Sequence, residues 1–223
     1  MSYSQILWVF IGVSFLTYFL ISLVYKSLNI QNLEKALLSS NGLRLLNLKH
    51  ILGIIFFGVL FNIIAPELRF LFLGIEIPKL HILLLILIVI FLSAYISYKA
   101  ITNKQIENLA SGYFSFPRIC WYFIIRFFFL FCYEFFFRGV LLFELLELTS
   151  LFYAITANTL LYVIIHIFDS KNEILGAIPF GIILCLSAYF TNSIWYAFFI
   201  HLTLSAVYEI SMFYYLTLKT SKS

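Results

Sequence analysis

The stretch Ile82–Tyr98, ILLLILIVIFLSAYISY, contains no charged residue and approaches the length of a membrane span. A spanning helix needs about 20 mostly apolar residues. Across all 223 residues, 63% are apolar and 11% charged, whereas about a quarter of a soluble domain is charged. So few charges exclude a soluble domain, a disordered protein and a nucleic-acid-binding protein. The length of the apolar runs also excludes an outer-membrane barrel, whose strands alternate apolar with polar residues over about ten positions.

Seven segments approach the length of a membrane span. We expect them to form an all-α, polytopic transmembrane helix bundle that is a single integral membrane domain over residues 1–223. A further half-helix near residues 66–80 would raise the count to eight. The expected spans are Ile6–Tyr25, Ile51–Pro66, Ile82–Tyr98, Ile119–Phe143, Thr149–Phe168, Ile174–Phe190 and Ile194–Leu218.

The positive charges predict an orientation for these spans. Alternating seven spans places the connectors 26–50, 99–118 and 169–173 on the same side as the C-terminal tail. That side carries most of the 14 Lys and Arg residues, whereas the connectors on the other side carry only Arg69 and Lys79. Because Lys and Arg are enriched on the cytoplasmic side, the N-terminus is expected outside and the C-terminus in the cytoplasm.

Ionisable residues inside the expected spans concentrate in the last four. A charge at the bilayer centre costs about 2.5–3.5 kcal/mol on insertion scales, so such residues by default indicate a functional site that faces the bundle interior. Glu134 and Arg138 lie four residues apart, on one helix face, and can pair. A structural ion pair that locks helix packing is the alternative interpretation. His166 and His201 each lie in a different span, and a lone histidine there can also serve as an interhelical hydrogen-bond partner.

Two further features accompany these residues. Arg126 lies within two turns of the cytoplasmic end of its span, where its side chain is expected to snorkel to the interface. His201, Ser205 and Glu209 recur every four residues and form one hydrophilic seam on the last helix. Glu209, deeper in the membrane, is expected to pair with an arginine or to line a cavity.

A carboxylate and two imidazoles on three helices indicate a specific chemistry. The carboxylate can act as general base on a water molecule, while one histidine shares that water or binds a metal. The second histidine can donate a hydrogen bond to a developing oxyanion. These parts suffice to hydrolyse a peptide bond. They would also suit the proton relay of a transporter, although transporters often show repeated halves and this sequence shows none.

Three sequence blocks resemble the motifs of one family. Tyr133-Glu134-Phe-Phe-Phe-Arg138-Gly139 resembles its first motif, Glu-Glu-x-x-x-Arg, and Tyr162-Val-Ile-Ile-His166 resembles its second, Phe-x-x-x-His. Thr191-Asn-Ser-Ile-Trp195, followed by His201 and Ser205, resembles the third block, a Thr-x-Ser-Leu-Trp turn before His-x-x-x-Asn or His-x-x-x-Asp. The family is that of the CAAX-protease and bacteriocin-processing proteins (CPBP, or Abi), which are intramembrane proteases. The resemblance covers residues 116–210.

The resemblance implies a CAAX-type protease, of the metalloprotease or glutamate type, in a bacterial plasma membrane. Its substrate would be a membrane-associated peptide or protein, and its partners would include the lipid bilayer but no nucleic acid. His166 would position water or metal with Glu134, Arg138 would orient Glu134, and His201 would stabilise the oxyanion with help from Ser205. A divalent metal such as zinc would take Glu134, His166 and His201 as ligands.

Two positions depart from the family pattern. Tyr133 stands where the family has its first glutamate, which is thought to activate water, and Ser205 stands where it has Asn or Asp. A phenol stays protonated near neutral pH and cannot replace a carboxylate base. Adjacent helix positions point about 100° apart, so Glu134 does not simply take over. A catalytically inactive member that acts as a membrane scaffold or immunity-type binding protein is therefore the alternative function.

Overall fold

The protein is a bundle of long apolar helices, seen in a computed structural model that describes residues 2–102 and 116–220, with side chains up to residue 215. Of these described residues, 88% are helical and none lies in a strand. Within the described ranges, seven helical spans are long and apolar enough to cross a membrane. The predicted all-α polytopic bundle is thereby confirmed.

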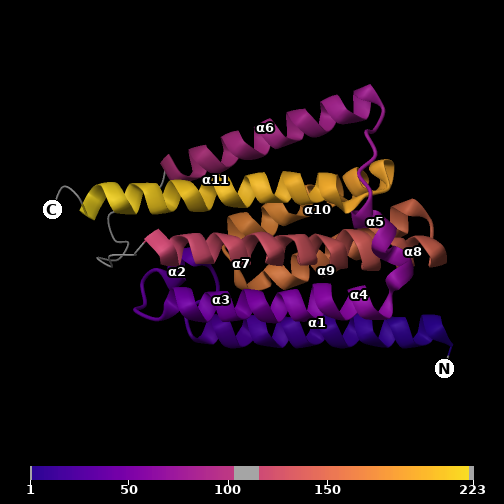
Figure 1. The fold of residues 1–223 in the computed structure, drawn as a ribbon, viewed down its shortest axis with the longest axis horizontal. Helices are drawn as coiled ribbons and strands as arrows, with labels where there is room; N and C mark the ends of the chain where they lie inside the picture. Colours follow the sequence, from indigo (N-terminus) through magenta and orange to yellow (C-terminus); the bar gives the residue numbers. More distant parts are fainter. Residues whose placement is uncertain (1, 103–115, 221–223) are drawn as a thin grey trace.

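Figure 1 shows the long helices running roughly in one direction, with the start of α1 and the end of α11 at opposite ends of the bundle. Several spans change helix type along their length. The first three are α1 (Tyr3–Ser27), then α3 (Gly42–Gly53) continued by a π-helical turn (Ile54–Val59) and α4 (Leu60–Ile64), then α6 (Leu80–Thr102). The last four are α7 (Phe116–Glu134) with a π-helix (Phe135–Leu141) and α8 (Leu142–Leu148), α9 (Leu151–Ile165) with a 3₁₀ turn (His166–Phe168), α10 (Lys171–Thr191) and α11 (Ile194–Thr220).

Most span boundaries shift by a few residues from the expected ones, and the start of the second span shifts furthest. The second span begins at Gly42 rather than at Ile51, because polar residues such as His50 turn inward and are buried there. Residues 66–80 form no eighth span: they contain a 3₁₀ turn (Pro66–Arg69) and the four-residue helix α5 (Phe70–Leu73). Part of the connector 99–118, with Lys104, and the tail residue Lys222 lie outside the described residues.

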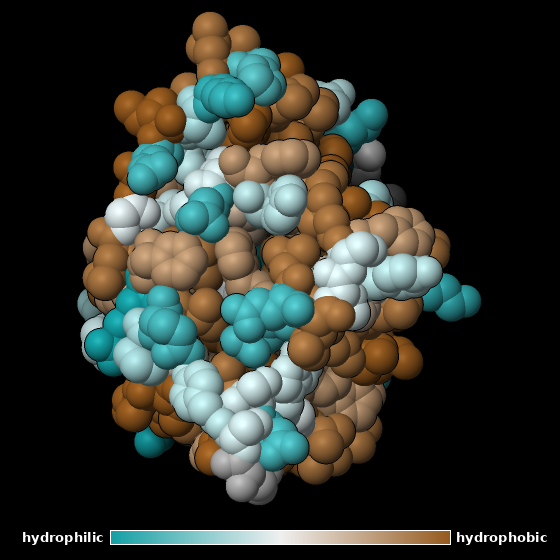
Figure 2. All heavy atoms as spheres, turned by 90° about the vertical axis from the view of Figure 1, so that its right-hand side faces the viewer, coloured by the Kyte–Doolittle hydropathy of each residue, from teal (hydrophilic) through white to brown (hydrophobic). Residues whose placement is uncertain are grey.

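The outward faces of the spans are apolar. Phe91 on α6 and Phe152 on α9 are both 72% exposed, as suits side chains that face lipid rather than water. Figure 2 looks onto the end of the bundle that holds the N-terminus and shows hydrophilic side chains spread across this end amid hydrophobic ones. The seven apolar spans and their apolar outward faces identify an integral multi-pass membrane protein.

Helix α6 lies on the outside of the bundle and packs along α11. Its inward face carries small polar residues, and the Ser97 hydroxyl donates a hydrogen bond to the Leu204 carbonyl oxygen at 2.7 Å. The centre of the bundle is instead the π-helical segment after α7, where Phe136, Phe137 and Val140 are completely buried. The charged motif of the first block is therefore placed at the most enclosed point of the fold.

Two glycines let the second span approach α7 closely. A Cβ atom at Gly53 would overlap the ring of Phe129, and one at Gly58 would overlap the side chain of Cys132. The Phe129 ring is itself fixed, because it stacks on both Tyr18 and His50. Small residues at such contacts allow membrane helices to pack backbone to backbone.

The substitution Gly53→Ala is expected to destabilise the fold by about 1–3 kcal/mol, because the added methyl group overpacks a rigid contact. The apparent unfolding temperature of the purified protein in detergent measures the effect. Gly12→Ala on α1 is the matched control, since nothing lies within 4 Å of its added Cβ, and it should stabilise the helix by about 0.5–1 kcal/mol. Equal shifts in the two variants would show that the close approach at Gly53 is not required.

Candidate functional site

The first motif lies where the helix of the fourth span changes type. Glu134 is the last residue of α7, and Arg138 and Gly139 belong to the π-helix that follows. A π-helical segment leaves backbone groups without their α-helical partners and is frequent at functional sites. Here the side-chain amide of the buried Asn158 on α9 donates to the Phe137 carbonyl oxygen at 2.6 Å. The irregular backbone is thus stabilised from a neighbouring helix.

Glu134 is the centre of a buried charge network. Its Oε1 lies 2.5 Å from Nδ1 of His201, and its Oε2 lies 3.3 Å from Nε of Arg138. Glu134 and Arg138 are completely buried and His201 is 6% exposed. The pairing of Glu134 with Arg138 expected from their spacing is confirmed, and the structure adds His201 from a helix 67 residues further on.

The guanidinium of Arg138 also contacts an aromatic face. Its central carbon lies 4.2 Å from the ring centroid of Tyr162, a geometry in which the cation is attracted to the π-system. The same ring lies 4.7 Å from the imidazole of His166 and 6.5 Å from that of His201. Tyr162, the first residue of the second motif, therefore connects all three motifs.

The turn of the third block fixes the start of α11. Asn192 adopts the left-handed conformation (φ 50°) that ends α10, and Ser193 Oγ donates to the Leu71 carbonyl oxygen at 3.3 Å. The indole nitrogen of Trp195 donates to the Phe72 carbonyl oxygen at 2.9 Å. These bonds join α11 to α5 and so determine where His201, two turns further along, meets Glu134.

His166 is oriented by a partner that the sequence did not indicate. Its Nδ1 lies 2.8 Å from Oδ2 of Asp169, three residues further on, where a 3₁₀ turn replaces the α-helix. Its Nε2 is buried, with no hydrogen-bond partner among the described residues. When Nδ1 donates to the carboxylate, Nε2 is left as an acceptor. The only sequence signal was an aspartate three positions after the histidine.

One cavity of about 990 Å³ adjoins these residues. The structure brings His166, His201 and Ser205 of the predicted site to its wall, whereas Glu134 and Arg138 lie behind the wall and reach it through His201 and Tyr162. Other polar side chains also line the cavity, among them His50, Tyr122, Arg126 and Glu209. All five predicted site residues therefore belong to one region of the bundle.

Tyr133 faces this cavity from the position of the family's first glutamate. Its side chain is 3% exposed, its hydroxyl has no hydrogen-bond partner in the described part of the chain, and its ring lies 5.9 Å from that of His201. Glu134 does not replace the missing carboxylate, because its oxygens face Arg138 and His201. The motif thus presents a phenol to the cavity instead of a carboxylate.

Arg126 and Glu209 pair with one another, which corrects the expectation for Arg126 and confirms the one for Glu209. Arg126 does not snorkel: its Nε donates to Glu209 Oε1 at 3.0 Å inside the bundle, and both residues line the cavity. Glu209 was expected to pair with an arginine, and this pairing is confirmed. Pairing the largely buried Glu209 with the partly buried Arg126 costs less than leaving either charge alone there.

The predicted metal ligands are each bonded to another residue. Glu134 and His201 are bonded to one another and His166 to Asp169. Within residues 2–102 and 116–220, no group of three or more His, Cys, Asp or Glu is arranged to hold a metal ion. This geometry does not fit a metal held by Glu134, His166 and His201, and the divalent metal stays a prediction from the resemblance.

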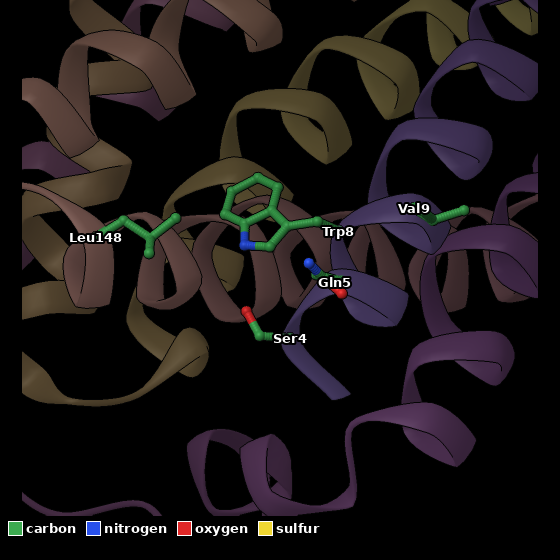
Figure 3. Close-up of a pocket in the computed structure, with 5 residues that line it drawn as sticks. All are labelled: Ser4, Gln5, Trp8, Val9 and Leu148. Atoms are coloured by element: carbon green, nitrogen blue, oxygen red, sulfur yellow. The ribbon is translucent and has the colours of Figure 1, made fainter. Parts of the chain in front are cut away.

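A second hollow lies at the opposite end of the bundle, where α1 begins and α8 ends (Figure 3). None of its lining residues is charged, and none belongs to the predicted site. They are Ser4, Gln5, Trp8, Val9 and Leu148.

Comparison with known proteins gives one match. Residues 114–207 match the family model described as Type II CAAX prenyl endopeptidase Rce1-like. The matched segment contains all three motifs and nearly coincides with the expected core, residues 116–210. No curated protein and no solved structure matches the chain.

Replacing Arg138 with methionine is expected to destabilise the protein by about 3–5 kcal/mol, because the Glu134 carboxylate then stays buried with only His201 as a partner. The double variant Arg138→Met with Glu134→Gln should recover much of this loss, since it removes both charges. Apparent unfolding temperatures in detergent measure all variants. The control Arg69→Met changes a partly exposed arginine that donates to the Asn62 carbonyl oxygen. If Arg138→Met has the same apparent unfolding temperature as Arg69→Met, the buried charge network does not stabilise the fold.

Proposed function

We propose that this membrane protein, whose residues 114–207 match the Rce1-like family model, is an intramembrane endopeptidase. Its substrate would be a membrane-associated peptide or protein whose chain enters the cavity inside the bundle. The observation that carries the proposal is the gathering of His166, His201 and Ser205 on one cavity wall. Each histidine is oriented by its own carboxylate.

The first step of the proposed reaction is the activation of water by His166. Asp169 accepts from Nδ1–H, so the buried Nε2 accepts a proton from a water molecule in the cavity. The resulting hydroxide forms a bond to the carbonyl carbon of the peptide. Asp169 stabilises the imidazolium that this step produces, as a carboxylate does in a catalytic triad.

His201 stabilises the oxyanion in this mechanism. Its Nδ1 is bonded to Glu134, so Nε2 is the nitrogen that remains to donate to the oxyanion when the ring is protonated. Arg138 holds Glu134 in place, and Ser205, one turn further along α11, supplies a hydroxyl donor. When the tetrahedral intermediate collapses, the carbon–nitrogen bond breaks and the leaving amine takes the proton from His166.

A second function is favoured by Tyr133. The family's first glutamate is absent, and Glu134 is already engaged by Arg138 and His201. The same cavity would then hold a peptide or a partner membrane protein without cleaving it, and the protein would act as a membrane scaffold or an immunity-type binding protein.

The proposed location is a bacterial plasma membrane, with the N-terminus outside and the C-terminus in the cytoplasm. Residues of the connectors predicted on the cytoplasmic side line the cavity, among them Gln31 and Asn32 of one and Asp169 and Ser170 of another. The cavity would therefore lie toward the cytoplasmic side.

Cleavage of fluorogenic peptides by the purified protein in vesicles tests the endopeptidase. We expect His201→Ala to lower kcat about 10²–10³-fold, by analogy with loss of an oxyanion donor, and Glu134→Ala to lower it as well. His81→Ala is the control, because His81 is exposed and does not line the cavity. Cleavage that appears only in Tyr133→Glu would establish the scaffold function for the natural sequence.

Metal analysis tests the cofactor separately. Because the three predicted ligands bond to other residues, we expect the purified protein to contain no stoichiometric zinc and to keep its activity in EDTA. Elemental mass spectrometry measures the metal content before and after chelation. One zinc per chain that is lost on replacing His166 would instead show that the three ligands rearrange around a metal.

A further inference from the structure

The hydroxyl of Tyr133 is a buried polar group that the proposed reaction leaves unused. Tyr133 lines the cavity and is 3% exposed. Its hydroxyl has no hydrogen-bond partner among the described residues, although a buried tyrosine usually finds one. The next aromatic residues of the chain, at positions 135–137, are all phenylalanine, so a ring without a hydroxyl would serve packing alone. Because an unbonded buried donor is costly, its retention indicates a partner that enters from the cavity.

Aromatic neighbours fix the ring of Tyr133. Its centroid lies 4.7 Å from that of Phe137 on the π-helix and 5.6 Å from that of Phe129 on α7. The ring of Phe57 on the second span lies at 5.8 Å, and that of Tyr162 on α9 at 5.9 Å. Rings from three spans thus surround the phenol, and close packing of this kind keeps a side chain in one rotamer. A donor held in a fixed position is what stabilisation of a developing charge requires.

The phenol also lies beside the imidazole that stabilises the oxyanion in the proposed reaction. The ring centroids of Tyr133 and His201 are 5.9 Å apart. Glu134, next to Tyr133 in the chain, holds His201 through Nδ1 and leaves its Nε2 for the substrate. The ring of Tyr162 contacts both Tyr133 and His166. A peptide carbonyl group held between the two histidines therefore comes close to the phenol.

The chemistry of a phenol determines which step it can assist. Because a phenol stays protonated near neutral pH, its hydroxyl can donate a hydrogen bond but cannot act as the base that activates water. His166, oriented by Asp169, supplies that base in the proposed reaction and later protonates the leaving amine. The oxyanion needs hydrogen-bond donors, and a neutral tyrosine hydroxyl can serve as one. Stabilisation of the oxyanion is therefore the step that Tyr133 can assist.

We propose that Tyr133 is a catalytic residue whose hydroxyl donates a hydrogen bond to the oxyanion, alongside Nε2 of His201. This inference rests on the proposed endopeptidase function. When the hydroxide formed at His166 bonds to the carbonyl carbon, the carbonyl electron pair moves to the oxygen, which accepts from the phenol without taking its proton. When the carbon–nitrogen bond breaks, the pair returns and the carbonyl group forms again. The tyrosine at the position of the family's first glutamate is then part of the active site.

Removal of the hydroxyl alone tests this role. Tyr133→Phe keeps the ring and its packing, and it is expected to lower kcat for a fluorogenic peptide about 10²-fold, as loss of an oxyanion donor does. KM should stay within about twofold, because the hydrogen bond strengthens only as charge develops on the oxygen. The matched control is Tyr122→Phe, which removes the hydroxyl of another buried tyrosine of α7 that lines the cavity. Its kcat should stay within about twofold of the wild-type value.

Stability separates the catalytic role from a structural one. Removing a buried hydroxyl that lacks a partner is expected to leave the apparent unfolding temperature in detergent unchanged or slightly raised. A fall in kcat at unchanged stability supports the proposal. A wild-type kcat in Tyr133→Phe, or an equal fall in Tyr122→Phe, would overturn it and leave the endopeptidase function standing. A lower unfolding temperature in Tyr133→Phe would show that the hydroxyl supports the fold, which would also overturn it.

Binding of a tetrahedral mimic decides the inference if the wild type cleaves no peptide, in which case the endopeptidase proposal fails. The probe is a labelled phosphinate peptide, whose anionic tetrahedral group resembles the oxyanion intermediate, and it is compared with the corresponding amide peptide by fluorescence anisotropy in EDTA. The wild type is expected to bind the phosphinate at least about tenfold more tightly, and Tyr133→Phe should lose this preference while binding the amide equally well. Equal binding of both peptides by the wild type, or a preference that Tyr133→Phe retains, would overturn the proposal.

Discussion

The ion pair between Glu134 and Arg138, completed by His201, is the constraint on which the rest of the structure depends. Both charged side chains are completely buried, and each would be costly at that depth without the other. To keep them paired, the backbone changes to a π-helix after Glu134, Asn158 bonds to its Phe137 carbonyl oxygen, and the start of α11 is bonded to α5. These arrangements bring three sequence motifs from separate spans to one place.

The same network determines which groups remain for chemistry. Glu134 is completely buried, forms an ion pair with Arg138, is hydrogen-bonded to His201 and does not line the cavity. Because Tyr133 replaces the other motif carboxylate, no motif carboxylate faces the cavity to activate water. The Asp169–His166 pair has the required form, with a buried nitrogen that has no partner in the described part of the chain. In the proposed reaction, the Asp169–His166 pair activates the water molecule and the Glu134–His201 pair stabilises the oxyanion.

Features local to one helix could be predicted from the sequence, and features that depend on how helices are rotated could not. Apolar runs predicted the seven spans, and a four-residue spacing predicted the Glu134–Arg138 pair. The partner of Arg126 is Glu209, 83 residues away, so Arg126 read alone resembles a snorkelling residue at a helix end. Asp169 was missed because it lies just beyond the end of the expected span, in the connector 169–173, although its spacing of three residues from His166 is one at which helical side chains meet.

Isotope labelling of the product tests the central claim, that this cavity hydrolyses a peptide bond with a water molecule. The wild-type protein in vesicles would be incubated with a peptide substrate in H₂¹⁸O, and the products would be analysed by mass spectrometry. The account predicts cleavage with one ¹⁸O atom in the newly formed carboxylate, and loss of this product in His166→Ala. Absence of cleavage by the wild type, with labelled product formed by Tyr133→Glu, would contradict it and support a natural protein that does not cleave peptides.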